Sequence, residues 1–463
     1  MKGRELLNLG IPRGECVKLA QTLAKLAAAS GLKKKQIRSY MREVVASPAD
    51  HTEHPYFANL AIALLDPGRL EFQERAEPAP WKQWGQDLEK QAIEQMENAC
   101  RLPVAVAGAL MPDAHLGYGL PIGGVLATEN AIIPYAVGVD IACRMKLTVL
   151  DMPVDAFKGQ RERLIKTLES ETRFGIGAKF DKPHDHAVMD QDWNITTNVR
   201  NLKEKARKQL GSSGSGNHFV EFGTVTLEQD DLGLKAGTYL ALMSHSGSRG
   251  AGATIANYYS RLARELHPEL PKQLQHLAWL DMDSEAGQEY WAAMNLMGDY
   301  AAANHDVIHR EIAKSLRTKV LADIENHHNF CWRQELDGRE VYVHRKGATP
   351  AHKGELGVIP GSMASPAYIV RGRGNEESLH SASHGAGRAM SRKKANQNFT
   401  WSEVKKELRS KDVTLLSAGL DEVPGAYKDI NEVMNAQSDL VDIVARFEPK
   451  IVKMAPAGER PED

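Results

Sequence analysis

Residues 87–111 set the fold class of this chain: they read DLEKQAIEQMENAC, then RLP, then VAVAGALM. The stretch 87–100 is amphipathic and consists mostly of strong helix formers, which predicts a helix there. An apolar run at 104–111 follows after a short break. A helix next to a compact apolar run is typical of a domain that mixes helices with sheets.

The rest of the chain extends this pattern. Glycine-rich turns separate short β-like runs, and two long helical patterns interrupt them. Strands and long helices that do not alternate regularly indicate an α+β fold rather than βαβ repetition. The β-like runs are 131–139, 239–243, 341–344 and 368–370, and the helical patterns are 251–265 and 284–316.

Upstream, residues 5–65 repeat apolar side chains at spacings of three and four, which predicts helices. The proline-rich stretch 77–80 is typical of a linker. We therefore expect a helical extension at 1–77 and a second, larger domain at 78–463. The extension either packs without any chemistry of its own or touches nucleic acid through the basic group Lys33, Lys34, Lys35 and Arg38.

Composition narrows the class of protein. The chain has 463 residues and a net charge of -2, so any basic surface must be local. No apolar run of about 18 residues could cross a bilayer, and the first residues lack the apolar core of a signal peptide. The four cysteines are widely spaced and form no disulfide framework. We expect a cytoplasmic monomer.

Metal-ligand side chains recur in predicted loops. Asp140 and Cys143 stand three residues apart, so one turn can direct both to a single ion. His218, His245 and His328 each lie beside glycine or asparagine, where a side chain can reach a shared pocket. A thiolate, a carboxylate and three imidazoles suffice for one closed metal site or two open ones. Ligand softness favours zinc, with manganese and iron as competitors.

Two glycine-rich stretches, 214–217 (GSGN) and 385–388 (GAGR), favour phosphate binding. Successive backbone N–H groups can form a concave anion site there, and the missing Cβ atoms allow close approach. Arg249 and Arg388 add guanidinium donors. Neither stretch matches GxxxxGK[ST], nor GxGxxG after a clear strand, which excludes a standard NTPase or dinucleotide site.

His384 directly precedes the second glycine-rich stretch. A neutral imidazole held next to a bound triphosphate can attack the α-phosphate and form a phosphoramidate. A metal on the phosphates would spread the developing charge. The alternative interpretation is a histidine that only caps its loop, beside glycines that are only turns.

Together these stretches resemble the RtcB family of RNA-splicing ligases, from about Trp81 to near the C-terminus. The resemblance implies that family's fold, with mixed β-sheets, flanking helices and a deep central cleft for two metal ions. It rests on these segments in the family's order: PDAHLGYG, GVDIAC, GSGNHFVE, HSGSRG, HHN, RKGA, IPGSM, NEES, HGAGRAMSR and GAYKDI.

The resemblance also implies roles for single residues. Two Mn²⁺ ions, rather than zinc, would share Cys143, with Asp140 and His218 completing one site and His245 and His328 the other. His384 would carry the guanylate from GTP, and Arg249 would hold RNA phosphate. The nucleotide contacts it implies are Asn217, Glu221, Ser362, Gly385, Ala386, Gly387 and Tyr427.

The resemblance implies an enzyme that joins RNA 3′-phosphate or 2′,3′-cyclic phosphate ends to 5′-hydroxyl ends. The reaction would serve RNA repair or tRNA splicing. An archease-like activator is a further expected partner. Two other interpretations stay open. The chain could be a metal-dependent phosphoesterase that opens cyclic phosphates, or a non-catalytic RNA-end-binding protein.

The chain departs from the family pattern at four places. Arg144 follows Cys143 where glycine is usual, His305 replaces the arginine of an Asn-Arg pair, and Ala367 replaces a serine near the base. The family ends in Lys-Gly, whereas this chain continues beyond Met454, leaving Lys453 as the candidate for the base-reading lysine. These changes leave the transfer chemistry intact and bear on base preference.

Overall fold

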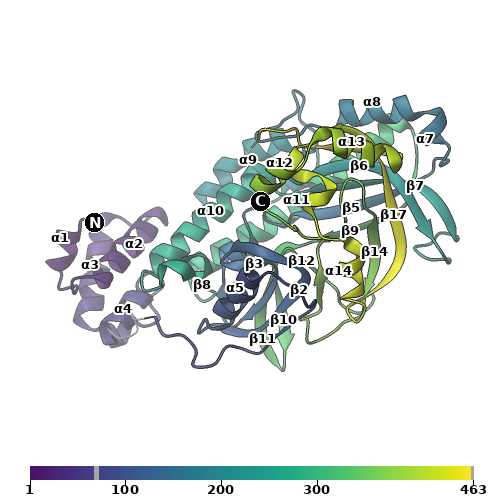
Figure 1. Cartoon of the computed structure of the whole chain (residues 1–463). Coiled ribbons are helices and arrows are strands. Elements are labelled where there is room, and N and C mark those ends of the chain that lie inside the picture. The colour runs from purple at the N-terminus through teal and green to yellow at the C-terminus, as the bar shows by residue number, and fades with distance from the viewer. Residues whose placement is uncertain (67–71, 460–463) are drawn as a thin grey trace.

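The computed structural model describes residues 1–66 and 72–459. It has the mixed α+β architecture expected from the sequence. One sheet has five strands in the order β1-β2-β3-β11-β10. The other has eight strands: seven in the order β13-β14-β17-β6-β7-β5-β9, and β16, which pairs with β17. Two small sheets, β12-β15 and β4-β8, complete the set among the described residues. Figure 1 shows long helices covering one side of the strands.

The elements have the following bounds. The helices are α1 (Gly3–Leu7), α2 (Glu15–Ala29), α3 (Lys34–Ala46), α4 (Ala58–Leu65), α5 (Lys90–Cys100), α6 (Pro134–Val137), α7 (Ala156–Gly159), α8 (Arg161–Glu171), α9 (Thr197–Gln209), α10 (Arg249–Leu266), α11 (Glu285–Leu316), α12 (Arg392–Asn398), α13 (Trp401–Ser410) and α14 (Ile430–Asn435). The strands are β1 (Trp81–Gln83), β2 (Ala105–Tyr118), β3 (Leu120–Thr128), β4 (Ala131–Ile132), β5 (Arg144–Leu150), β6 (Phe219–Leu227), β7 (Gly237–Ser246), β8 (Leu280–Asp281), β9 (Val320–His327), β10 (Asn329–Leu336), β11 (Arg339–Lys346), β12 (Ala348–Pro350), β13 (Leu356–Ile359), β14 (Ala367–Gly372), β15 (Ser381–Ser383), β16 (Thr414–Ser417) and β17 (Val441–Met454).

The eight-stranded sheet curves into a near-barrel with two separate cores. Its inner face packs a cluster that includes Met145, Leu147 and Met243. Its outer face is covered by α11, whose Ile308 and Ile312 join Phe222 in a second cluster. Because β5 is covered on both faces, every one of its residues is buried, and it shows none of the alternation that marks a half-exposed strand.

The five-stranded sheet lies against α5. An added Cβ at Gly108 of β2 would lie 2.3 Å from Met96 and 2.8 Å from Cys100, both on α5, so only glycine permits this close packing. The β2–β3 hairpin is irregular, with register shifts on either side of His115. Such bulges change the direction in which side chains point and recur next to active sites.

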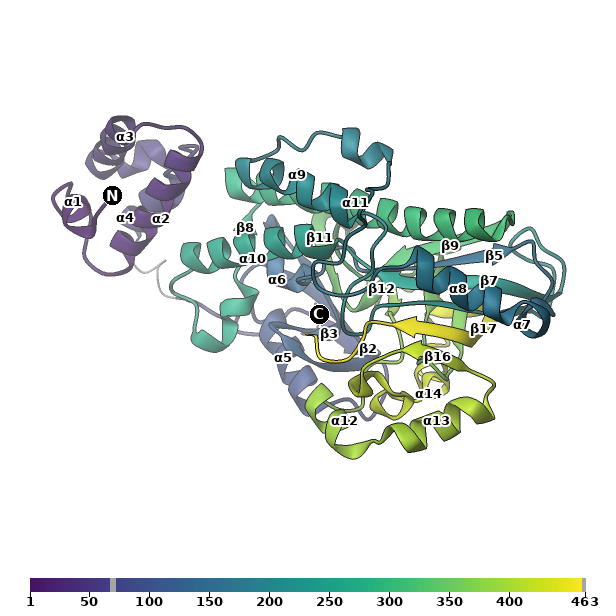
Figure 2. The ribbon, with the colours of Figure 1, turned by 90° about the horizontal axis from the view of Figure 1, so that it is seen from above.

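The N-terminal helices α1–α4 build a core of their own, which includes Leu19, Met41 and Leu60. They form a separate lobe beside α10 (Figures 1 and 2). The lobe meets the body through Lys25, 3.7 Å from Glu265, and Ser30, which donates to Glu285 at 3.1 Å. The division of the chain into 1–77 and 78–463 stays a prediction.

Sequence patterns located most helices but misjudged some strands. The helix expected at 87–100 begins at Lys90. The β-like run 131–139 was wrong beyond Ile132, because Pro134 starts the short helix α6 and proline suits the first turn of a helix. Strands β5, β6 and β17 carried no recognised signal. Among the described residues, no helix has both the length and the apolar composition needed to cross a membrane.

Candidate active site

The predicted metal ligands come from neighbouring ends of four adjacent strands. Cys143 precedes β5, His218 precedes β6, His245 lies in β7 and His328 follows β9. In the register of the sheet, His245 pairs with Met145 and with Phe219, so these strand ends lie side by side. Asp140 joins from a turn in which the Cys143 N–H donates to its carbonyl at 3.2 Å, as the three-residue spacing predicted.

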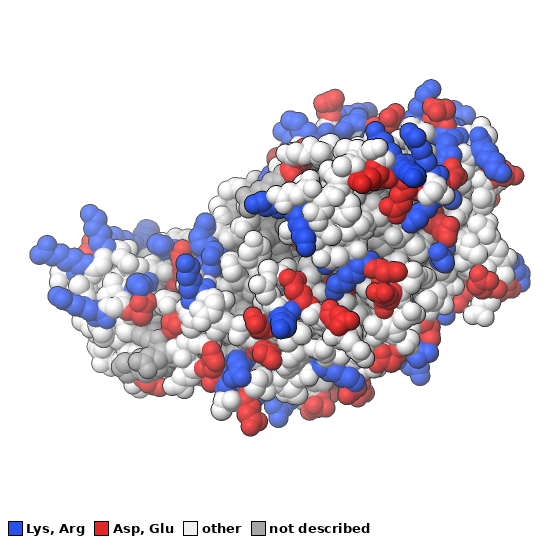
Figure 3. All heavy atoms as spheres, viewed as in Figure 1, with Lys and Arg blue, Asp and Glu red and all other residues white. Residues whose placement is uncertain are grey.

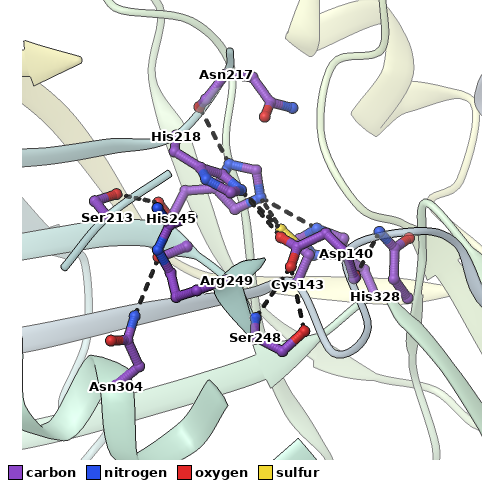
Figure 4. A network of polar contacts seen from close by, with 12 residues as sticks. Asp140, Cys143, Ser213, Asn217, His218, His245, Ser248, Arg249, Asn304 and His328 are labelled. Carbon is purple, nitrogen blue, oxygen red and sulfur yellow. Dashed lines mark hydrogen bonds and ion pairs between the residues drawn. The ribbon is translucent and has the colours of Figure 1, made fainter. Parts of the chain in front are cut away.

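Their donor atoms converge (Figure 4). The Cys143 Sγ lies 3.0 Å from His245 Nε2 and 3.4 Å from His218 Nε2, and His245 Nε2 lies 3.2 Å from His328 Nε2. Asp140 Oδ2 lies 3.2 Å from His218 Nε2. The five side chains form two buried groups, each with its ligand atoms within 4.8 Å of one another, and Cys143 belongs to both.

Hydrogen bonding fixes which nitrogen of His245 can bind a metal. Its Nδ1 lies 3.2 Å from the carbonyl oxygen of Asn217, which can only accept, so Nδ1 carries the proton. Burial lowers the pKa of His245 to about 3, so the ring is neutral and Nε2 holds a lone pair. That lone pair faces the Cys143 sulfur and the His328 ring at contact distance. A metal ion bound among these electron-rich atoms would stabilise this arrangement.

Asp140 is also oriented for metal binding. Burial would raise the pKa of its carboxyl, but the interaction with His218 holds the pKa below its ordinary value. The Ser248 N–H donates to its Oδ1 at 3.0 Å. An added Cβ at Gly247 would lie 2.0 Å from Oδ2, so glycine is required where this loop passes the carboxylate.

A hollow that opens to solvent lies over this cluster. Ala367 and Ser365 also lie in its wall, with the Ser362 hydroxyl 2.9 Å from that of Ser365. Its lining includes four of the predicted metal ligands, the predicted nucleophile and all of the predicted nucleotide contacts: Asp140, Cys143, His245, His328, His384, Asn217, Glu221, Ser362, Gly385, Ala386, Gly387 and Tyr427.

His384 is oriented by a residue to which sequence reasoning gave no role. Asp113 of β2 accepts from its Nδ1 at 2.7 Å and from its backbone N–H at 3.2 Å. Burial would raise the pKa of Asp113, but His384 and Lys428 hold it below the ordinary value. Because a carboxylate can only accept, the proton of the neutral ring lies on Nδ1 and the lone pair on Nε2. The signal in the sequence was the PDAHLG segment, singled out without a role for its aspartate.

The far end of the hollow carries two buried carboxylates. No described residue donates a hydrogen bond to the side-chain carboxyl of Glu221, and burial raises its pKa well above the ordinary value. Glu422 instead pairs with Arg388 at 3.3 Å and also contacts the Tyr427 hydroxyl. Arg388, expected to bind phosphate, lies over the Tyr427 ring and so helps to fix that ring in the wall.

Three other residues lie outside the lining of the hollow. Arg249 is 1% exposed and donates to the Gly175 carbonyl at 3.0 Å, so its predicted contact with RNA phosphate stays a prediction. Arg144 pairs with Glu325 at 3.2 Å rather than adding its charge to the hollow. Lys453 donates to the Leu168 carbonyl at 3.2 Å. Successive side chains of a strand point to opposite faces, so Lys453 points away from the hollow that its neighbours Val452 and Met454 line.

Comparison with known proteins agrees with this geometry. Residues 95–454 match the family model described as tRNA-splicing ligase RtcB. The chain is similar to an RNA-splicing ligase RtcB of Escherichia coli (strain K12), with 35% identity over 80% of this chain and 95% of the relative. It is also similar to a tRNA-splicing ligase RtcB of Nanoarchaeum equitans, with 32% identity over 79% and 91%. Residues 1–94 lie outside the family match.

Proposed function

The chain belongs to the RtcB family of RNA-splicing ligases, and from this we propose that it joins RNA 3′-phosphate or 2′,3′-cyclic phosphate ends to 5′-hydroxyl ends through a guanylate carried on His384. The observation that carries the proposal is the pairing of His384 with Asp113, which places the proton of the neutral ring on Nδ1 and the lone pair on Nε2. The ring of His384 lies 5.0 Å from that of His328, beside the predicted metal ligands.

In the first step, Nε2 of His384 attacks the α-phosphorus of GTP. A P–N bond forms, the bond to the bridging oxygen breaks, and pyrophosphate leaves. Positive charge develops on the imidazole as the bond forms. Asp113, charged and 2.7 Å from Nδ1, stabilises that charge and holds the ring in place.

In the second step, an oxygen of the RNA 3′-phosphate attacks the guanylate phosphorus and the P–N bond breaks, returning His384 to its neutral form. A cyclic end must first be opened by water. In the third step, the 5′-hydroxyl of the other RNA attacks the activated 3′-phosphate, loses its proton, and GMP leaves. Both ends have to enter one hollow, which suits unpaired termini.

Asp140, Cys143, His218, His245 and His328 would hold two divalent ions, which we propose to be Mn²⁺. Bound ions supply Lewis-acid stabilisation of charge on the phosphoryl oxygens. The residues fit this role because a cysteine, an aspartate and three histidines bring their ligand atoms together in two groups that share Cys143, and the proton on Nδ1 of His245 leaves its Nε2 facing the cluster. The need for an archease-like activator stays a prediction.

Glu221 supports a preference for guanine. A carboxylate inside an apolar wall with no partner of its own can accept from two adjacent N–H groups. The N1–H and 2-amino group of guanine provide such a pair, whereas adenine provides none at that edge. Tyr427, fixed by Glu422, supplies a ring for the base to lie against.

The test is incubation of the protein with α-labelled GTP and Mn²⁺, followed by denaturing electrophoresis. We expect covalent label on the wild type and none on His384→Ala. His352→Ala, a histidine outside the hollow, serves as the matched control and should be labelled normally. The bond should be labile to acid and stable to base, as a phosphoramidate is.

Absence of label from GTP and from ATP on the wild type would contradict the proposal. If the wild type and His384→Ala then both opened 2′,3′-cyclic phosphates at equal rates, the phosphoesterase interpretation would replace it. If neither variant changed RNA ends but both bound them, the non-catalytic interpretation would stand.

A further inference from the structure

An exposed aromatic side chain lies at the tip of the β2–β3 hairpin. Tyr118 is 66% exposed, more than any other large apolar side chain in the described part of the chain, and Leu116, two residues earlier, is 47% exposed. The proposed chemistry uses neither of them. Two exposed apolar side chains on one hairpin tip beside a candidate active site form a surface on which a ligand can lie.

Tyr118 belongs to a group of three rings. Its centroid lies 6.3 Å from that of Tyr135 and 5.6 Å from that of His276, and Tyr135 and His276 lie 4.5 Å apart. The other two rings are partly buried and support the exposed one from behind. We name Tyr118, Tyr135 and His276 the aromatic platform.

The platform is held rigidly. Lys346 donates to the Tyr118 carbonyl at 2.7 Å and lies 5.0 Å from the centre of the Tyr135 ring, so it ties the hairpin tip to the second ring. Gly119, with a φ of +72°, forms the tip, and a Cβ there would lie 2.8 Å from the His276 carbonyl oxygen. A surface that is ordered before binding loses less entropy when a ligand arrives.

The platform adjoins the mouth of the hollow. His115 and Ile122, opposite one another on β2 and β3, both line the hollow. Tyr118 lies three residues beyond His115, about 10 Å along a strand. On the other side, Gly347 follows Lys346 and lines the hollow, where its added Cβ would lie 3.2 Å from the His384 ring.

We propose that the aromatic platform is a stacking subsite for an unpaired base of the RNA, a few nucleotides from the end that enters the hollow. A terminal phosphate bound near His384 leaves the following nucleotides outside, where the hairpin tip is the adjacent surface. Bases of any identity stack on exposed aromatic rings. The platform would therefore favour single-stranded or frayed ends without reading their sequence. The inference rests on the proposed function.

The test measures RNA affinity apart from catalysis. Fluorescence anisotropy with a labelled single-stranded RNA bearing a 3′-phosphate, and with one bearing a 5′-hydroxyl end, is recorded for wild type, Tyr118→Ala and Tyr118→Trp. Ile443→Ala, a 56% exposed side chain on β17, is the matched control. We expect about tenfold weaker binding of at least one RNA by Tyr118→Ala, wild-type affinity for Tyr118→Trp, and no change for Ile443→Ala.

RNA with abasic positions near its end identifies the contact. It should bind the wild type as weakly as intact RNA binds Tyr118→Ala, and the two changes together should cost no more than either alone. Equal RNA affinity of wild type and Tyr118→Ala would overturn the inference. So would an undiminished Tyr118→Ala effect on abasic RNA, since the contact would then be to the backbone.

Guanylylation without RNA is measured on the same preparations. We expect Tyr118→Ala to impair RNA binding more than guanylylation. An equal loss in both would overturn the inference, because the hairpin would then act through the fold of the hollow. Lack of guanylylation in the wild type would instead refute the proposed function, while the anisotropy results would still decide whether the platform binds bases.

Discussion

Asp113 and His384 are 271 residues apart in the chain, and their side chains meet at 2.7 Å between Oδ2 and Nδ1. Strand β2 supplies the carboxylate and the loop after β15 supplies the imidazole. Because the carboxylate can only accept, the pairing fixes the tautomer of His384 and presents Nε2 toward the hollow.

The Asp113→Asn variant should lose guanylylation by about 100-fold or more while binding GTP normally. The amide keeps the shape of the side chain but removes the charge that stabilises the developing imidazolium. Single-turnover labelling at saturating GTP checks the rate. Asp231→Asn, which alters an ion pair with Arg371 outside the hollow, is the control. A normal rate in Asp113→Asn would mean that the carboxylate has no role in the first step.

Gly387→Ala should also slow labelling, by about 100-fold. Gly387 has a φ of +70°, and an added Cβ would lie 2.1 Å from the Asp113 carbonyl oxygen, so the loop that carries His384 would have to move. A displacement of about 1 Å can cost about 100-fold in rate.

Gly354→Ala separates backbone strain from this clash. Gly354 has a similar φ of +85° with open space around its Cβ position. Its alanine variant should lose only about 1 kcal/mol of folding free energy, seen as a small drop in Tm, and keep its activity. Equal effects of the two substitutions would show that the contact with Asp113 does not matter.

Metal stoichiometry should follow the shared thiolate. We expect the wild type to bind two equivalents of Mn²⁺, His328→Ala and Asp140→Ala to retain one each, and Cys143→Ala to lose both, because Cys143 belongs to both groups. Elemental analysis after dialysis measures this. Cys331→Ala, a buried thiol outside the hollow, is the control. Two equivalents on Cys143→Ala would exclude a bridging thiolate.

GTP binding should strengthen as pH rises above the ordinary titration range of a glutamate. Burial raises the pKa of Glu221, so its carboxyl is protonated at a pH where an exposed glutamate is charged. The charged form accepts the two N–H groups of guanine, so affinity increases as the proton is lost. Titration of GTP at several pH values checks the direction.

Glu221→Gln should remove this pH dependence and reduce the preference for GTP over inosine triphosphate, which lacks the 2-amino group. Glu448→Gln, an exposed glutamate paired with Arg446, should change neither property. A wild-type pH profile in Glu221→Gln would assign the titration to another group.

Sequence patterns predicted the helices of this protein better than its strands. The long helices α10 and α11 lie where periodicity predicted them, because both bury apolar side chains at helical spacings, and α11 is buried over most of its surface. Strand β5 escaped notice because it is covered on both faces and includes Arg144 and Lys146, whose charges are neutralised by Glu325 and Asp323. Alternation of apolar and polar residues identifies only strands that have one solvent-exposed face.

The sequence by itself determined which chemical groups this protein contains and the family to which it belongs, because glycine-rich turns, ligand residues and their order along the chain are local properties. Only the tertiary structure decided their partners. The pairing of Asp113 with His384, the lone pair of His245 and the turning of Lys453 out of the hollow all depend on contacts between distant segments. Such contacts form when tertiary packing brings the ends of distant strands together. The local sequence sets which way a side chain points from its own strand, but not which distant residue it will contact.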